Sequence, residues 1–236
     1  PLGFGYAALP FRSSWRYGLG DVELGAKYRL FAHEHYATAV QAIVRLPTAG
    51  PDSADDLQRQ SLGDRVLGLE GRLTQELTLG PLWLNVAVHA GLQRPGTCVR
   101  RVAPPDAFFV PATSTATLRW DPGDYAGVDV APLLRLSREF AAGVTAGYFT
   151  KAQDHYAYQS VQDSLDLVTR TGAATPASVL DAGTSQRRLR IGFALTYHAP
   201  MVEGGFSIEQ TVSGRGGPVP AATVYRIVFR ASQRLF

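Results

Sequence analysis

The sequence has a single cysteine, Cys98, so no disulfide can form within the chain. It contains no apolar run as long as the roughly eighteen residues that a membrane-spanning helix needs. Charged residues make up only 18% of the chain, whereas an ordinary soluble domain has about a quarter. The net charge of +3 is small and scattered, and it gives no sign of a nucleic-acid partner. These absences argue against a disulfide scaffold, a bundle of membrane helices and a nucleic-acid-binding protein.

Glycine and aromatic residues are well represented, with 24 glycines and 10% aromatics in 236 residues. The mean hydropathy lies near zero, as it also does in a membrane barrel, whose apolar residues occupy only alternate positions. We interpret residues 1–236 as one domain of a mature or trimmed chain, because the first residue is Pro1 and no apolar signal segment is present. The export signal is then expected to be missing, and the absence of an N-terminal strand pair is left open.

The most informative pattern is an alternation with a period of two, and residues 21–31 show it over their whole length. One parity is apolar and consists of Val22, Leu24, Ala26, Tyr28 and Leu30. The other parity is polar and consists of Asp21, Glu23, Gly25, Lys27 and Arg29. Successive side chains of a strand point to opposite faces, so the segment is predicted to be a strand with one apolar and one charged face.

The same alternation recurs along the chain, in residues 36–46, 67–77, 82–92, 126–136, 142–151, 189–197, 206–212 and 225–231. Residues 2–9 are a weaker tenth candidate. We therefore predict an all-β fold, a transmembrane antiparallel up-and-down β-barrel of about ten strands. A missing N-terminal hairpin would make the number twelve, and a strand within residues 98–120 would also raise it.

A soluble β-sandwich also alternates, and it is the competing interpretation. Two features favour a membrane. The clearest alternating runs last about 9–11 residues, which is the length a tilted strand needs to cross the hydrocarbon, whereas soluble strands average about five or six. The apolar parity of these runs is also almost free of charged residues.

The connections between the predicted strands alternate between short and long. Short connections are expected near residues 31–36, 78–81, 138–140 and 199–205. Long ones are expected at residues 47–65, 94–124, 159–187 and 214–220. Bacterial outer-membrane barrels have short periplasmic turns and longer extracellular loops. The alternation of short and long connections therefore predicts an outer-membrane location, with both termini in the periplasm and the long loops outside.

The chain ends in Phe236, and a terminal aromatic residue on an amphipathic strand is typical of substrates of the barrel-assembly machinery. This machinery and outer-membrane lipid are the expected partners. Phe236 has the opposite parity to Tyr225, Ile227 and Phe229, so a bulge near residues 232–234 would be needed.

The segment GLGDVELGAKYRLF at residues 18–31 resembles a recurrent stretch in a family of bacterial outer-membrane proteins. These proteins are described as transporters or as the meta-pathway phenol-degradation type. The matching residues are Gly18, Gly20, Asp21, Leu24, Gly25, Lys27, Tyr28 and Arg29. The resemblance covers about a quarter of the chain, and it implies a barrel that passes or binds small, hydrophobic solutes.

The polar parity of the strands is predicted to line the lumen. Its charged members are Glu23, Lys27, Arg29, Arg45, Glu70, Arg72, Glu76, Asp129, Arg135, Lys151, Arg188, Arg190, Glu209, Arg226 and Arg230. One interpretation is a narrow pore for hydrophobic or anionic solutes. The other is a lumen plugged by salt bridges, in a structural barrel that belongs to a larger envelope complex with protein partners. The sequence leaves both open.

The sequence does not predict an enzyme. No histidine has a serine two residues away, and Asp154 and His155, being adjacent, would point to opposite faces of a strand. His33 and His35 could share a metal, but a polar turn explains them better, so no metal and no cofactor are expected. Cys98 is expected to be incidental, and the glycines of residues 214–217 are interpreted as a hairpin loop.

Overall fold

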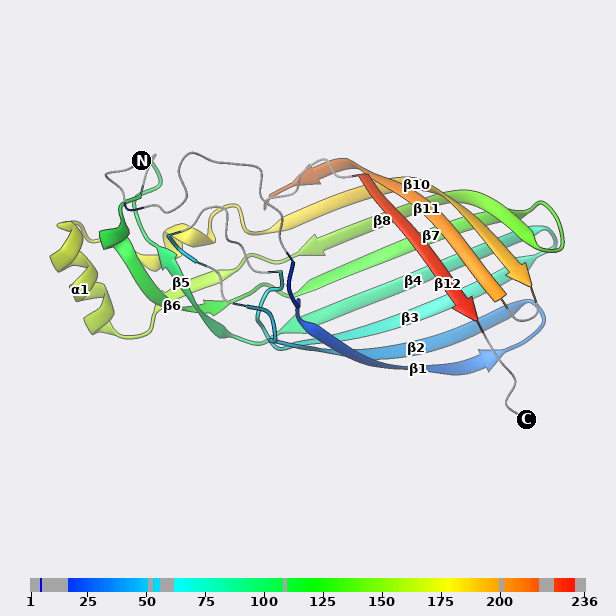
Figure 1. The fold of residues 1–236 in the computed structure, drawn as a ribbon, viewed down its shortest axis with the longest axis horizontal. Coiled ribbons are helices and arrows are strands. Elements are labelled where there is room, and N and C mark those ends of the chain that lie inside the picture. Colours follow the sequence, from blue (N-terminus) through cyan, green and yellow to red (C-terminus); the bar gives the residue numbers. More distant parts are fainter. Residues whose placement is uncertain are drawn as a thin grey trace.

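The structure is a computed structural model that describes residues 5, 17–50, 53–55, 62–107, 110–199, 202–216 and 223–231. Its main feature is a nine-stranded antiparallel sheet that curls, so that β12 passes in front of β4 and β7 while β1 lies along the lower side, next to β2 (Figure 1). The strands of this sheet, in their order across it, are β1 (Val22–Ala32), β2 (Tyr36–Leu46), β3 (Gly68–Leu79), β4 (Leu82–Gln93), β7 (Tyr125–Arg135), β8 (Phe140–Lys151), β10 (Gln186–Ala199), β11 (Val202–Arg215) and β12 (Thr223–Ala231).

All nine clearly alternating segments of the sequence are strands of this sheet, and every neighbouring pair is antiparallel. The prediction of an all-β, antiparallel fold is confirmed at this level. Two irregularities interrupt the registers, one between Arg29 and Phe31 in β1 and one between Leu189 and Arg190 in β10.

The sheet has two free edges among the described residues, because β1 pairs only with β2 and β12 only with β11. The nine strands are therefore not closed into a barrel. Both edge strands run toward the end of the sheet that carries the short turns, as β1 leads into the turn at residues 33–35 and β12 ends beside Val202. An antiparallel closure would need an odd number of further strands between them.

The predicted tenth strand, residues 2–9, lies outside the described residues except for Gly5. Gly5 is in a turn with a φ of 67°, and its carbonyl accepts a hydrogen bond from Arg101 at 2.9 Å. Gly5 is therefore not part of the nine-stranded sheet. It lies at the end of the long connections, whereas the sequence analysis had placed the N-terminus at the opposite end.

Two of the predicted long loops contain a second sheet, which no pattern in the sequence clearly indicated. Its strands are β5 (Gly96–Arg101), β6 (Thr115–Asp121) and β9 (His155–Tyr158), in the order β5-β6-β9. The 3-10 turns η2 (Ala112–Ser114) and η3 (Ala177–Asp181) and the helix α1 (Val161–Thr171) pack with it. In Figure 1 this unit extends beyond one end of the large sheet, opposite the short turns.

Helix α1 has clear start and stop signals. Ser160 and Asp163 form a reciprocal capping box, in which the Ser160 hydroxyl accepts from the Asp163 amide. Gly172 ends the helix in the left-handed region at a φ of 74°, where a side chain would be strained. The helix buries Leu167 against Leu118, in a small core that also contains Val102, Ala116 and Ala177. No helix in the described part of the chain is long and apolar enough to span a membrane.

Buried polar contacts join the second sheet to the large one. Asp154 pairs with Lys151 at the end of β8 at 2.6 Å and accepts a hydrogen bond from the Gly123 amide at 2.8 Å. Within the second unit, Asp181 of η3 accepts from the Tyr156 amide of β9 at 2.8 Å and pairs with His155 at 3.2 Å. Because the Asp154 contacts hold the chain where it leaves the large sheet, the second sheet is fixed in place rather than tethered by a loop.

Candidate functional site

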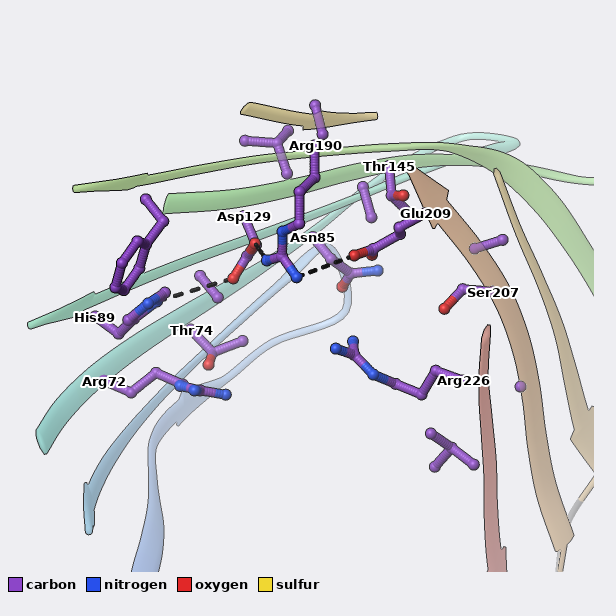
Figure 2. Close-up of a pocket in the computed structure, with 18 of the residues that line it drawn as sticks. Arg72, Thr74, Asn85, His89, Asp129, Thr145, Arg190, Ser207, Glu209 and Arg226 are labelled. Carbon is purple, nitrogen blue, oxygen red and sulfur yellow. Dashed lines mark hydrogen bonds and ion pairs between the residues drawn. The ribbon is translucent and has the colours of Figure 1, made fainter. Parts of the chain in front are cut away.

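The polar face of the nine-stranded sheet encloses a cavity of about 1080 Å³ (Figure 2). Eight of the nine strands, β2 to β12 in this sheet, contribute lining residues. The lining includes Gln93 and Gln186 near the long connections, and it includes His198 and Glu203 beside the short turn that precedes β11. The cavity therefore extends along most of the length of the strands.

Most of the charged residues that the alternation assigned to the interior do line cavities. Nine line the large one, namely Arg45, Glu70, Arg72, Asp129, Lys151, Arg188, Arg190, Glu209 and Arg226. Lys27, Arg29 and Glu76 line a second cavity of about 240 Å³ beside β1, β2 and β3. Glu23 lines neither but pairs with Arg45 at 2.6 Å. The side chain of Arg230 lies outside what the structure describes.

Arg135 behaves differently from the rest of this set. Its guanidinium lies over the ring of Trp83, 4.5 Å from the centroid, and it is absent from the lining of both cavities. A stacked guanidinium of this kind is held by the ring quadrupole and by apolar contact rather than by an acid. Arg135 is therefore a packing residue near the short turns.

The centre of the wall is organised by Arg190 on β10. One of its terminal nitrogens donates to Asp129 on β7 at 3.0 Å, and the other pairs with Glu209 on β11 at 3.3 Å. Asp129 also lies 3.8 Å from the ring nitrogen of His89 on β4. Figure 2 shows these four side chains in one row across the cavity wall. The row joins four strands, so it fixes their relative positions as well as their charge.

This row depends on a close approach at Gly147 of β8, which lies between Asp129 and Arg190 in the register. A Cβ atom at position 147 would meet the Asp129 carboxylate at 2.5 Å and the Arg190 guanidinium at 3.1 Å. A glycine is required here because the ion pair passes directly over the backbone of the intervening strand.

A second set of contacts lies on β3, β7, β8 and β10, nearer the long connections. Glu70 on β3 accepts from Arg72 at 2.9 Å and from the Tyr125 hydroxyl at 2.7 Å. Both carboxylate oxygens of Glu70 are therefore used. Tyr125 in turn packs on Phe149, and Arg188 lies over the Phe149 ring at 4.8 Å from its centroid.

One register row of the sheet contains basic residues and no acid. Its inward residues are paired from strand to strand in the order Lys27, Gln41, Arg72, His89, Gly127, Phe149 and Arg188. The alternation predicts which residues face inward, but only the strand registers show that these basic residues share one row.

The acids of the interior are more completely paired than its bases. Glu23, Glu70, Asp129, Glu209 and Asp154 all bond to cationic side chains. Lys27, Arg29, Arg188 and Arg226 make no ion pair with any residue that the structure describes. The free charge of the inner face is therefore mainly positive, because paired acids contribute little net field.

The interior also contains an apolar cluster, which the alternation did not predict. Leu133, Ala141 and Ala194 have the inward parity and are buried, and Trp83 packs against them. The Trp83 ring also meets the edge of His198 at 5.3 Å. The cluster lies near the short turns and narrows the polar face there. Parity alone could not reveal this cluster, because Leu133 is an apolar residue at a position of the inward, mostly polar parity.

The remaining residues that the sequence singled out are not brought together. Asp154 faces Lys151 and His155 faces Asp181, so the two adjacent residues point apart. The His33 ring packs on Tyr36, and the carbonyl of His35 accepts from Thr78. No group of three or more histidines, cysteines or acids in the described ranges could hold a metal ion. Cys98 is partly buried beside the small core.

No protein-family model matches the chain, and no curated protein sequence matches it either. The resemblance of residues 18–31 to outer-membrane transporters therefore stays a prediction.

Proposed function

We propose that the chain forms a β-barrel in a bacterial outer membrane, with a narrow lumen that passes small anionic solutes. The observation that carries this proposal is the inverted arrangement of the nine-stranded sheet, which is charged inside and apolar outside. Its outward residues are exposed although they are large and apolar, as for Ile227 at 81% and Phe229 at 73%. A face of this extent is costly in water and favourable in lipid.

The dimensions of the strands support the same conclusion. The strands of the large sheet have 9 to 14 residues, and a tilted strand needs about 9–11 to cross the hydrocarbon. The strands of the second sheet have only 4 to 7 residues, close to the soluble average of about five or six. The strand lengths of the large sheet thus suit a membrane, whereas those of the second sheet suit water.

The orientation follows from the connections. The short turns would face the periplasm, and the second sheet would stand outside the cell with the other long connections. Closure of the barrel would require at least one further strand between β12 and β1, running opposite to both. In a membrane the open edges would otherwise leave backbone groups without partners, at a cost of several kcal/mol each.

The cavity favours a pore over a plugged lumen. It extends from Gln186 to His198 along β10, which is about 40 Å of strand at roughly 3.3 Å per residue. The unpaired cations Arg188 and Arg226 line it. Positive groups inside a low-dielectric wall raise the local concentration of anions, so the solutes are proposed to be anionic rather than purely hydrophobic.

The proposal is tested by reconstitution into planar lipid bilayers after refolding in detergent. We expect an ion current that prefers chloride over potassium, and we expect that preference to fall in Arg226→Gln. The folded barrel should also run faster on a gel before heating than after heating. A heat-modifiable protein that conducts no current would reject the pore, and a protein that is monodisperse without detergent would reject the membrane.

A structural barrel is the second candidate, and the second sheet favours it. That unit has its own core and is fixed to the large sheet through Asp154, as a module for holding an envelope partner would be. Stable co-purification with one partner, together with absence of current, would support this function over the pore.

A further inference from the structure

Two arginines extend into the large cavity from opposite walls. Arg72 lies on β3 and Arg226 on β12, and Figure 2 shows both guanidinium groups pointing into the same open space. Arg226 makes no ion pair with any described residue. Arg72 uses one terminal nitrogen to bond Glu70 at 2.9 Å, and the rest of its fork is not used by an acid.

The space between the two arginines contains donors but no free carboxylate. Thr74, Asn85 and Ser207 line it with neutral polar groups. The nearest acids are already held, because Glu70 bonds Arg72 and Tyr125 while Glu209 pairs with Arg190. Of the other three lining acids, Asp129 is bonded to Arg190, Glu203 lies at the short turn before β11, and Asp64 lies in the segment that leads into β3.

The chemistry of this arrangement is more specific than a positive field. A guanidinium presents parallel N–H donors in a fixed fork, which match two oxygens of a carboxylate or phosphate and give no advantage with a halide. Two forks, two hydroxyl groups and an amide that line one space can satisfy several oxygens of the same group. We propose that Arg72 and Arg226 form a binding site for the oxyanion group of a small solute, a carboxylate or a phosphate.

This inference rests on the proposed function, because the site lies in the proposed lumen. It adds that the lumen binds oxyanions at a defined and saturable place. The cavity of about 1080 Å³ is at the upper end of the range of small-molecule sites, about 300–1000 Å³. A small organic acid or phosphate compound would fit in the cavity together with water. The remaining water keeps the binding loose enough for the solute to be released.

The test is a chloride current in planar bilayers, measured as inorganic phosphate or acetate is added at constant ionic strength. We expect a saturable decrease of the chloride current with either anion. Block by both probes indicates that the site accepts carboxylates and phosphates, whereas block by phosphate alone indicates a phosphate site. Arg226→Lys keeps the charge but loses the fork, so the block by phosphate or acetate should weaken about tenfold. Arg119→Lys on the second sheet is the control and should behave like the natural chain.

Binding is measured independently, by calorimetry with phosphate on the refolded protein in detergent. Saturable binding that Arg226→Lys weakens supports the site even when no variant conducts, and in that case only the pore is rejected. A chloride current that neither anion blocks, or binding that Arg226→Lys and Arg72→Lys both leave unchanged, overturns the site while the pore stands.

Discussion

The three-stranded sheet buries Leu118 and Leu167 between itself and helix α1, and it presents Thr117 and Arg119 to the outside. The nine-stranded sheet does the reverse, with charged residues such as Arg190 inside and Phe193 exposed. The two sheets belong to one chain, so the difference reflects their surroundings and not the overall composition. Apolar side chains face whichever medium costs them least, which is a protein core in the small sheet and, in the barrel proposed above, lipid in the large one.

The comparison also concerns what holds each sheet together. The small sheet has a continuous apolar core, whereas the buried apolar residues of the large sheet are confined to Leu133, Ala141 and Ala194 within the described ranges. The large sheet relies instead on long backbone ladders and on ion pairs that cross several strands. Substitutions of the same chemical kind should therefore have different effects in the two sheets.

The largest effect is expected for Leu118→Ala in the small sheet. Leu118 is fully buried, at 0% exposure, and removing a buried leucine costs about 2–5 kcal/mol. Hydrogen exchange should show loss of protection in residues 96–121 and 155–181, while the heat-modifiable gel shift of the large sheet is kept. Thr117→Ala, exposed on the same strand, is the matched control. Loss of the gel shift in Leu118→Ala would mean that the two sheets do not unfold separately.

Charged substitutions on the two faces of β4 distinguish between lipid and water as the medium outside the large sheet. Val88 is exposed on the apolar face and Asn85 lines the cavity. We expect Val88→Arg to destabilise the folded protein in lipid vesicles by about 2–4 kcal/mol, the cost of an arginine near the bilayer midplane. Asn85→Arg should cost far less. The readout is the urea midpoint of unfolding, and equal midpoints for the two variants would contradict a lipid-facing surface.

The sequence was a good guide to the large sheet and a poor one to the small sheet, for physical reasons. Long strands with one lipid-like and one polar face repeat their parity many times, as in residues 21–31, and the signal accumulates. Short strands such as β9, with four residues, give too few repeats to stand out from loop composition. The pairing of Arg190 with Asp129 and Glu209 depends on the registers between strands, which parity does not determine. Parity also did not predict that apolar Leu133 is on the inward face, or that Gly5 lies outside the large sheet.

A smaller effect is expected for Gly147→Ala. The new Cβ would stand 2.5 Å from the Asp129 carboxylate and 3.1 Å from Arg190, so the ion pair across β8 must move. Crowding of this kind costs about 1–3 kcal/mol. Gly71→Ala in β3 is the matched control, because nothing lies within 4 Å of its Cβ. If both variants unfold at the same urea concentration in lipid vesicles, the row of Arg190 contributes nothing to the stability of the large sheet.

The smallest effect should appear only at high pH, and it concerns Tyr156 in the small sheet. Burial, and after it the charge of Asp154, raises the pKa of Tyr156 to about 12 from the ordinary value of 10.0. The folded state therefore holds the phenol proton more tightly than the unfolded state does. The resulting stability is complete below about pH 10 and is lost as the pH rises toward 12. Tyr156→Phe removes the proton and should flatten this part of the profile. Tyr156 stacks on Trp120 at 6.2 Å, so tryptophan emission, compared between pH 9 and 12, should follow the transition on a background from the other two tryptophans. An alkaline transition that Tyr156→Phe leaves unchanged would assign the pH sensitivity of the small sheet to another group.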